Sequence, residues 1–362
     1  MPAFDRLLAP AHVADITAFL VTQKAKPAEV KGATSEAPKS ETPNSESTPN
    51  GRPPETDAVK PNVDAKSKFG FEVKKDRLIM THAEKPLGEY VWGDTAIRRP
   101  FFANFHGLTG TKITRNHPPL ATDSSDHGTM HPGIWLGFGQ ISGVDFWRNQ
   151  GRIQHVKFLA PPTATEDRIT FATDSDMLKP DGKRMGTMVN RCTISRRPAG
   201  WLLVWDATFT ATEQDLAFGD QEEMGFGARI ASECTEQKGG TLVSSHGVKS
   251  AKETWGKPAA WCDYSGTKDG QRIGITLLAG PKNLRESWWH NRDYGVFVAN
   301  AFGRAAMKQG AASTVPVKRG ESLRIVYGAM LHDGKDYDPA MEYKHFIEVA
   351  DTESKSANPK SP

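Results

Sequence analysis

The chain has 362 residues, enough for one large domain or two of ordinary size, but its hydrophobic share of 37% is low, so part of it is expected not to fold. Its 46 basic and 43 acidic residues leave a net charge of only +3, which argues against the strongly basic surface of a nucleic-acid-binding protein. No run of about 18 apolar residues occurs, so no membrane-spanning helix is predicted.

The first 24 residues place apolar side chains at helical spacing. Leu7, Leu8, Ile16 and Leu20 recur so that they share one side of a helix. The spacing predicts a short amphipathic helix over residues 1–24. The segment lacks the long apolar core of a signal peptide, so none is expected there.

Composition then divides the rest of the chain into three parts. Residues 25–66 are rich in Pro, Ser, Thr, Glu and Lys and have almost no large apolar side chains, which predicts a disordered linker. Residues 67–335 contain the recurring apolar segments of a folded domain. Residues 336–362 are expected to form a mostly disordered C-terminal tail with short helical or irregular pieces.

The domain over residues 67–335 is predicted to be all-β. It consists of short alternating runs rich in β-branched and aromatic residues, separated by Gly, Asp, Asn and Pro. Within residues 201–212, for example, Leu203, Trp205 and Phe209 share one face of a strand. The pattern favours a many-stranded antiparallel β-sandwich in one domain.

Potential catalytic side chains are densest in residues 126–147. His127 and His131 are four residues apart, and Asp126 precedes them as a group that would orient an imidazole. The pair would serve as general acid and base, or as two ligands of a divalent metal. The alternative is a turn in which the histidines have no chemical role.

The same stretch supplies candidate substrate-binding groups. Trp135 and Trp147 are core residues by default, but an indole also suits stacking against a sugar ring. Asp145 and Arg148 flank Trp147 and would contact polar groups of a substrate.

A second dense stretch covers residues 288–303. His290, Arg292, Asp293 and Tyr294 combine a base, a cation, a carboxylate and a phenol, and all four are candidate catalytic residues. A salt bridge in a loop followed by a core strand is the structural alternative. Further substrate-binding candidates lie in this stretch and in two others: Trp289, Arg229 and Glu253.

These stretches together resemble a bacterial family of unknown function that is labelled methane oxygenase PmoA. The resemblance covers residues 98–333 and rests on DHGTMHPGIW, GVDFW, GRIQH, MGFGARIA, ETWGKPAAWCDYSG and WWHNRDYGVFVANAFG. The family is common in planctomycetes and other polysaccharide degraders. The resemblance implies a sandwich like those of mutarotases and polysaccharide lyases and a glycan as partner. Methane oxidation is not expected, because that label belongs to a membrane protein.

The chain departs from that family's pattern in two places. Gly128, Thr129 and Met130 interrupt a contiguous histidine cluster, and residues 279–283 lack the Asp-His pair that members carry. Both departures affect polar groups that members of the family would offer to a metal site or to an active centre.

The first 24 residues also resemble the end of a class I c-type cytochrome, in which Met1 would match the axial ligand. The chain has no CxxCH motif, so no haem is expected. This resemblance implies an exported relative and therefore a periplasmic or extracellular location.

Three functions follow from these observations. The first is a carbohydrate-active enzyme of lyase, epimerase or hydrolase type that acts on a glycan outside the cytoplasm. The second is a non-catalytic glycan-binding or envelope module that uses its tryptophans. The third is electron transfer with a haem partner, which rests only on the cytochrome-like start.

Overall fold

The computed structural model describes residues 50–55, 62–334 and 336–357. The predicted helix over residues 1–24 lies outside these residues, as do the parts of the predicted linker at 25–49 and 56–61.

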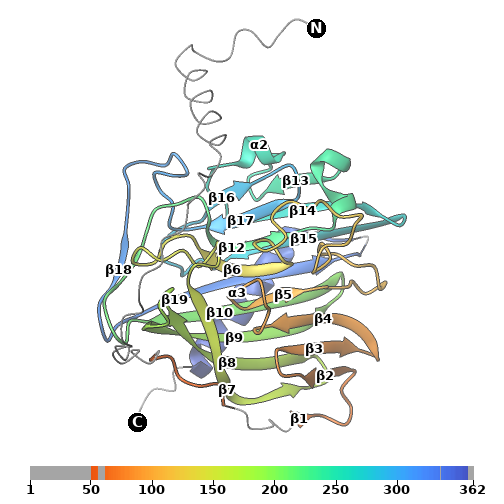
Figure 1. The fold of residues 1–362 in the computed structure, drawn as a ribbon. Coiled ribbons are helices and arrows are strands. Elements are labelled where there is room, and N and C mark those ends of the chain that lie inside the picture. Colours follow the sequence, from red (N-terminus) through yellow and green to blue (C-terminus); the bar gives the residue numbers. More distant parts are fainter. Residues whose placement is uncertain (1–49, 56–61, 335, 358–362) are drawn as a thin grey trace, which may run out of the picture. The chain divides into compact units, whose positions relative to one another are not determined.

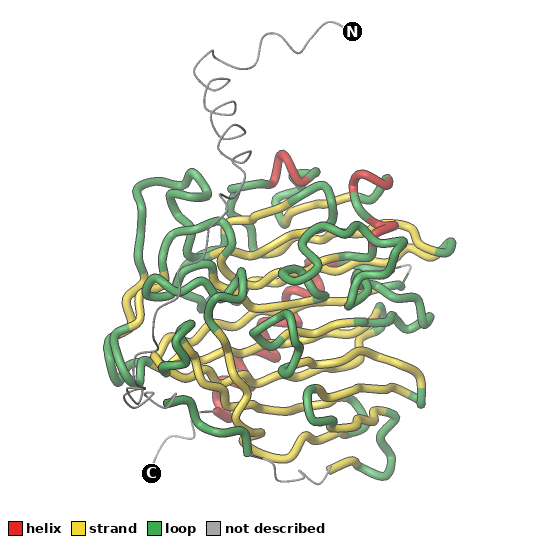
Figure 2. The backbone as a smooth tube through the Cα atoms, in the orientation of Figure 1, coloured by secondary structure: helices red, strands yellow, loops and turns green. Residues whose placement is uncertain are grey.

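Strands dominate the described part of the chain, and they form two large sheets (Figure 1; Figure 2, yellow). The larger sheet has nine strands in the order β1-β7-β8-β9-β10-β19-β15-β14-β13. All its neighbours are antiparallel except β1 and β7. Its strands are β1 (Asn62–Val63), β7 (Arg152–Ala164), β8 (Arg168–Leu178), β9 (Arg184–Arg197), β10 (Gly200–Thr210), β13 (Thr241–Ser244), β14 (Trp261–Lys268), β15 (Gln271–Ala279) and β19 (Ser322–His332).

The second sheet has eight antiparallel strands in the order β16-β17-β12-β6-β5-β4-β3-β2. Its strands are β2 (Phe69–Val73), β3 (Arg77–His82), β4 (Lys85–Val91), β5 (Phe101–Ala103), β6 (Ile134–Phe138), β12 (Met224–Arg229), β16 (Trp288–Asn291) and β17 (Val296–Asn300). A separate antiparallel pair joins β11 (Leu216–Phe218) to β18 (Val315–Val317).

The main core lies between the facing sides of the two large sheets. Trp205 of the nine-stranded sheet contacts Phe102 of the other sheet with ring centroids 5.2 Å apart, and Phe226 stacks on Tyr327 at 5.3 Å. Strand β10 alternates as predicted: Leu203, Trp205 and Phe209 all belong to this core, and every second residue points away from it. The all-β antiparallel sandwich is therefore confirmed.

Helix α3 (Pro339–Ala357) covers the outer face of the nine-stranded sheet (Figure 1). Phe346 is fully buried there against Leu202, Val204 and Met330. The structure therefore differs from the predicted disordered tail from residue 336, because β10 and β19 present an apolar outer face that the helix covers. The other described helices are short: α2 (Ala251–Thr254) and the 3-10 turns η1 (Ser232–Cys234) and η2 (Glu236–Lys238). None of the helices in the described part of the chain is both long and apolar enough to cross a membrane.

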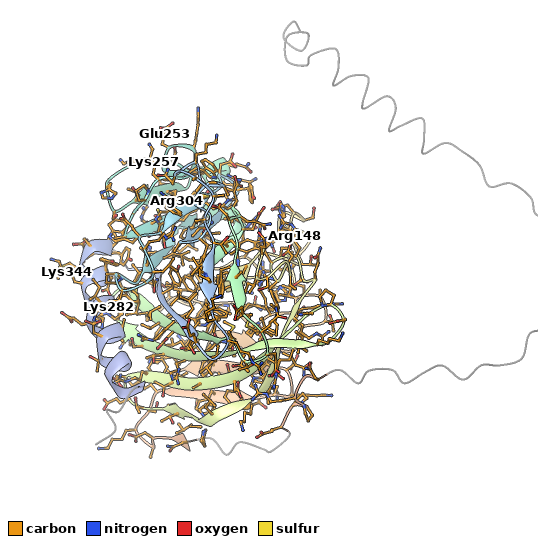
Figure 3. All side chains as sticks on the ribbon, turned by 90° about the vertical axis from the view of Figure 1, so that its left-hand side faces the viewer. Arg148, Glu253, Lys257, Lys282, Arg304 and Lys344 are labelled. Carbon is orange, nitrogen blue, oxygen red and sulfur yellow. The ribbon has the colours of Figure 1, made fainter. Side chains whose placement is uncertain are left out.

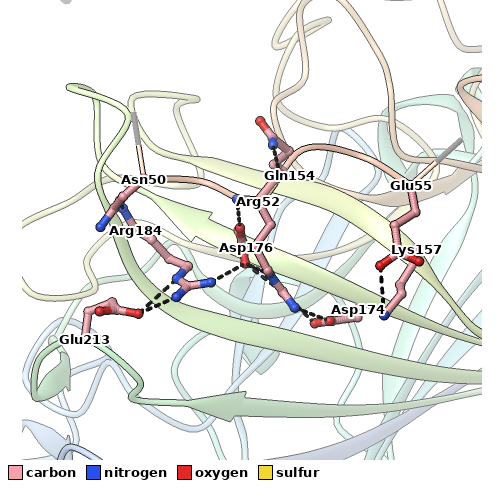
Figure 4. A network of polar contacts seen from close by, with 9 residues as sticks. All are labelled: Asn50, Arg52, Glu55, Gln154, Lys157, Asp174, Asp176, Arg184 and Glu213. Carbon is pink, nitrogen blue, oxygen red and sulfur yellow. Dashed lines mark hydrogen bonds and ion pairs between the residues drawn. The ribbon is translucent and has the colours of Figure 1, made fainter. Parts of the chain in front are cut away.

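Residues 50–55 belong to the predicted linker, yet they are fixed to the nine-stranded sheet (Figure 4). The Arg52 guanidinium donates two hydrogen bonds to Asp174, at 2.6 and 2.9 Å, and one to Asp176 at 2.8 Å. The backbone N–H of Arg52 also donates to Asp176, whose side chain is fully buried. These charge-assisted bonds explain why a segment with few apolar side chains is ordered here.

We expect Arg52→Gln to lower the free energy of unfolding by about 2–3 kcal/mol, because Asp174 and the buried Asp176 would lose their main partner. Lys157→Gln is the matched control, since it breaks only the exposed pair that Lys157 makes with Glu55 at 2.9 Å, and we expect it to cost less than about 1 kcal/mol. Urea unfolding of both variants measures the difference. Equal effects would show that Arg52 adds no more than a surface ion pair.

Candidate active site

The two predicted histidines lie in a tight turn just before β6. The backbone N–H groups of Met130 and His131 both donate to the carbonyl of His127 at 3.0 Å. His127 itself has a left-handed backbone, with φ of 51°, which is unusual for a residue other than glycine. The turn stacks the two imidazoles with centroids 4.7 Å apart, so the structure brings the predicted pair together.

A buried arginine from outside the dense polar stretches holds this turn. The Arg115 guanidinium donates to the carbonyls of Asp126 at 2.8 Å and His131 at 2.7 Å, and more weakly to those of Ser124 and His127. Its side chain is fully buried. Arg115 therefore fixes the backbone on both sides of the histidine pair.

A second buried arginine, Arg99, supports the turn from the neighbouring side. It donates to the carbonyl of Met130 and, at 2.9 Å, to that of Trp147. Burial lowers the pKa of Arg99 to about 9 and that of Arg115 to about 10, so both remain positively charged at neutral pH. No sequence signal identified these two arginines, since nothing in the local pattern shows which carbonyls a distant side chain will reach.

Asp126 joins the turn to strand β12. Arg229 of β12 donates two hydrogen bonds to the two oxygens of Asp126, at 2.9 and 2.8 Å. The same carboxylate contacts Nδ1 of His127 at 3.0 Å and accepts a hydrogen bond from Ser124. Partial burial alone would raise the pKa of Asp126, but these hydrogen bonds outweigh it and hold the pKa well below its usual range.

Tyr294, in the turn between β16 and β17, lies beside His127. The two rings are nearly parallel, with centroids 6.0 Å apart, and the Arg229 guanidinium lies 4.8 Å from the centre of the phenol ring. Burial raises the pKa of Tyr294, while the charges of Arg292 and Arg229 oppose that rise. Tyr294 is therefore protonated at neutral pH.

Arg292 connects this cluster to His290. It donates to Glu222 at 2.9 Å, and the same carboxylate oxygen lies 3.3 Å from Nδ1 of His290. Strand register places His290 opposite Val298, Val298 opposite Gly227, and Gly227 opposite Trp135. His290 therefore projects from the same sheet face as the cluster, and Arg292 and Glu222 link it to Tyr294.

Three of the predicted substrate-binding residues cannot act as a stacking platform. Trp135 and Trp147 are fully buried, and Trp135 lies directly beneath His131 with nearly parallel rings 5.1 Å apart. Trp289 points into the main core, where its indole N–H donates to the carbonyl of Ala259 at 3.0 Å. A stacking role does not fit these three indoles: the turn that carries His131 covers Trp135 and Trp147, and Trp289 precedes His290 on β16 and therefore points to the opposite face of the sheet.

The side chains of two other predicted residues form no described hydrogen bond or ion pair with the cluster. The Asp293 side chain is exposed, and its backbone carbonyl accepts a hydrogen bond from Tyr264 at 2.8 Å. Glu253 is exposed on α2, near Lys257 and well apart from Arg148 (Figure 3). Arg148 binds Asp145 at 3.0 Å and Glu223 at 2.8 Å, and it follows Trp147, whose ring contacts that of His131 edge-on with centroids 5.6 Å apart.

Asp126, His127 and His131 are also the described residues whose arrangement would suit a metal ion, since their ligand atoms lie within 4.8 Å of one another. Two features oppose it. Arg229 already binds both oxygens of Asp126, and the charges of Arg229, Arg99 and Arg115 all act on His131. A divalent metal at His127 and His131 therefore stays a prediction. Elemental analysis of the protein beside His127→Ala tests it, because a metal bound at this site would be stoichiometric in the wild type and lost in the variant.

The pKa of His131 gives a pH-dependent prediction. Burial, assisted by the charges of His127 and the arginines, lowers this pKa to about 2. From about pH 6.5 downward an unfolded chain takes up a proton on this residue while the folded chain does not, so stability falls by up to about 1.4 kcal/mol per pH unit. We expect His131→Gln to lose about 2 kcal/mol less free energy of unfolding than the wild type between about pH 7 and pH 5. Equal losses in urea unfolding at the two pH values would contradict this.

Comparison with known proteins gives a family match and several solved structures. A family model described as a family of unknown function (DUF6807) matches residues 77–344. No curated protein matches the sequence. The resemblance to the family labelled methane oxygenase PmoA was therefore wrong. The cytochrome-like segment precedes the matched range and lies outside the described residues, so it adds nothing to this identification.

The solved structures that are similar to this chain have low sequence identity to it. One is a galactose mutarotase-like protein from Clostridium acetobutylicum, with 7% identity and a TM-score of 0.38, covering 74% of this chain and 98% of that one. Another is the galactose 1-epimerase of Lactobacillus acidophilus NCFM, with 8% identity and a TM-score of 0.38 over 74% and 100% of the two chains. A polysaccharide lyase has 11% identity and a TM-score of 0.26 over 77% and 34%.

Proposed function

This chain belongs to the family of unknown function DUF6807, and we propose that it is a carbohydrate-active enzyme of the lyase or epimerase type. The observation that carries the proposal is the grouping of His127, Asp126, Tyr294 and Arg229 on one sheet face, with Arg292 beside them. A base, a phenol and cations in contact are the groups that proton abstraction next to a carboxylate requires.

His127 is the proposed general base. Asp126 stays ionised beside Arg229, so it accepts a hydrogen bond from Nδ1 of His127 and leaves the lone pair on Nε2. The His127 side chain is 41% exposed, whereas that of His131 is almost fully buried. His127 is therefore the imidazole that a substrate can reach, and His131 supports it from below.

Tyr294 and the arginines complete the proposed chemistry. In a lyase reaction His127 would take the proton from the carbon next to the sugar carboxylate. The electron pair would form a carbon–carbon double bond as the bond to the neighbouring glycosidic oxygen breaks, and the protonated Tyr294 would give its proton to that oxygen. Arg292 would neutralise the charge that develops on the carboxylate. Epimerisation would result instead if the bond to the glycosidic oxygen stayed intact and a proton returned to the opposite face of the same carbon.

The hydrolase type has less support. A glycosidase needs two carboxyl groups that act on the substrate. Here both oxygens of Asp126 bind Arg229, and Glu222 is paired with Arg292 and His290. A glycan-binding module that uses Trp135, Trp147 and Trp289 also has less support, because these three tryptophans are buried.

The substrate in this proposal is a sugar that carries a carboxylate. The supporting observation is the positive charge around the histidine pair, where Arg229, Arg99 and Arg115 all lower the pKa of His131. A panel of uronic-acid polymers and neutral polymers tests it, with ultraviolet absorbance to detect an unsaturated product and NMR to detect epimerisation. Turnover of neutral polymers alone would contradict the proposed substrate, and no turnover of any polymer would contradict the enzyme. A location outside the cytoplasm stays a prediction.

A further inference from the structure

A cleft of about 740 Å³ lies apart from the histidine cluster and contains none of the predicted site residues. Its walls come from the turn after β2, from the segment that follows β4, from β7, and from residues 54–55, which Arg52 holds in place (Figure 4). The volume is that of a small-ligand site.

The floor of this cleft is aromatic. The Trp92 ring is only partly buried, and it lies 4.8 Å from His155 and 5.4 Å from Phe158 between ring centroids. The indole N–H donates to the carbonyl of Lys75 at 3.3 Å, which helps to fix the ring. Nδ1 of His155 is buried and has no hydrogen-bond partner among the described residues. An aromatic face beside an unsatisfied polar atom suits a ring that carries hydroxyl groups.

The rim of the cleft is basic. Lys75, Arg98 and Arg152 are exposed at the cleft, and none of them forms an ion pair with a described carboxylate. The two acidic residues of the lining are already engaged. Glu55 binds Lys157 at 2.9 Å, and Asp94 binds His117 at 3.1 Å as well as two backbone N–H groups. The rim therefore has uncompensated positive charge over an aromatic floor.

The cleft is connected to the candidate active site through Asn149. The backbone N–H of Arg98 donates to the Asn149 side chain at 3.0 Å, and the Asn149 amide donates to the carbonyl of Thr129 at 2.8 Å. Thr129 belongs to the turn that carries His127 and His131. Asn149 thus bridges the wall of the cleft and that turn.

We propose that this cleft binds an acidic oligosaccharide, with a sugar ring against Trp92 and its carboxylate or sulfate groups on Lys75, Arg98 and Arg152. In a longer glycan the cleft holds a part of the polymer distant from His127. The test of this binding site measures affinity and not turnover, so its result can be interpreted whether or not the proposed function holds.

The test is calorimetric titration of the full-length protein with a galacturonic acid hexasaccharide, beside a neutral glucose hexasaccharide and a polyglutamate peptide. We expect the acidic hexasaccharide to bind and the combined variant Lys75→Glu, Arg98→Glu, Arg152→Glu to weaken binding by at least about tenfold. The matched control is Lys257→Glu, Arg304→Glu, Lys344→Glu, which makes the same change in net charge at exposed positions elsewhere (Figure 3). We expect it to change the affinity by less than about threefold.

Two further variants test whether the aromatic face of the cleft takes part in binding. Trp92→Phe keeps an aromatic ring and the fold, and we expect it to weaken binding through the loss of ring area. His246→Ala, at an exposed histidine that belongs to neither the cleft nor the candidate active site, is expected to leave the affinity of the hexasaccharide unchanged. Equal weakening in the rim variant and its control would overturn the proposal, as would equal binding of polyglutamate, or no binding of the acidic hexasaccharide.

Discussion

His127→Ala is expected to reduce turnover of the substrate by about 10²–10⁴-fold while leaving the fold intact. The reason is that His127 is the exposed imidazole of the pair, with its Nδ1 directed to Asp126 and its other nitrogen available to a substrate. A general base in this position contributes about this factor to a rate. The measurement is the initial rate on the polymer identified by the substrate panel, with circular dichroism to verify folding.

His246→Ala is the matched control for this variant. His246 is also exposed, but it lies in the turn after β13, away from the cluster, and we expect full activity from it. A second variant, Tyr294→Phe, removes only the proposed acid and keeps the ring beside His127. If His127→Ala retained wild-type turnover, the assignment of the base would be wrong. If His127→Ala lost turnover but Tyr294→Phe retained wild-type turnover, the leaving oxygen would have another proton donor.

Arg115→Leu is expected to lower the free energy of unfolding by about 3–5 kcal/mol. Its guanidinium donates to four backbone carbonyls of residues 124–131, and substitution removes all of these donors at once. The carbonyls are part of the backbone, so a matching apolar group cannot replace them, and each buried acceptor without a partner costs about 1–3 kcal/mol. Water that enters the space left by the guanidinium would bind some of these carbonyls and offset part of their summed cost. Urea unfolding measures the change.

Arg304→Leu serves as the control for Arg115→Leu, because Arg304 is exposed. We expect it to change stability by less than about 0.5 kcal/mol. Hydrogen exchange adds a local measurement: in Arg115→Leu the N–H groups of Met130 and His131, which close the turn onto His127, should exchange faster. Unchanged exchange at these two positions, together with unchanged stability, would show that Arg115 does not hold the turn.

The fold and about half of the candidate site were predictable from local sequence. Alternation along β10 placed Leu203, Trp205 and Phe209 on one face, and the structure has them in the core. The pairing of His127 with His131 also followed from sequence, because four residues bring side chains close in a turn as they do in a helix. Both predictions depend only on neighbours along the chain.

The predictions that failed depended on packing between distant segments. Trp135 and Trp147 seemed suited to a sugar, but the turn at residues 126–130 folds over them and His131 covers Trp135. Residues 50–55 were expected to be disordered, and residues 336–362 mostly disordered with short helical or irregular pieces. Asp174 and Asp176 bind the first segment, and the apolar outer face of β10 packs against the long helix α3. A composition rule cannot include a partner that lies more than a hundred residues away.

The all-β architecture follows from local sequence, because the period of apolar side chains decides which face of each strand is buried. Which of the polar residues form a site depends on contacts between segments that are distant in the chain. Arg229, Asp126 and Tyr294 come from three separate segments, and they meet because strand register brings β12 beside β17 and because Arg115 holds the intervening turn. Such contacts arise from strand pairing across the sheet, and the spacing of residues along the chain does not predict them.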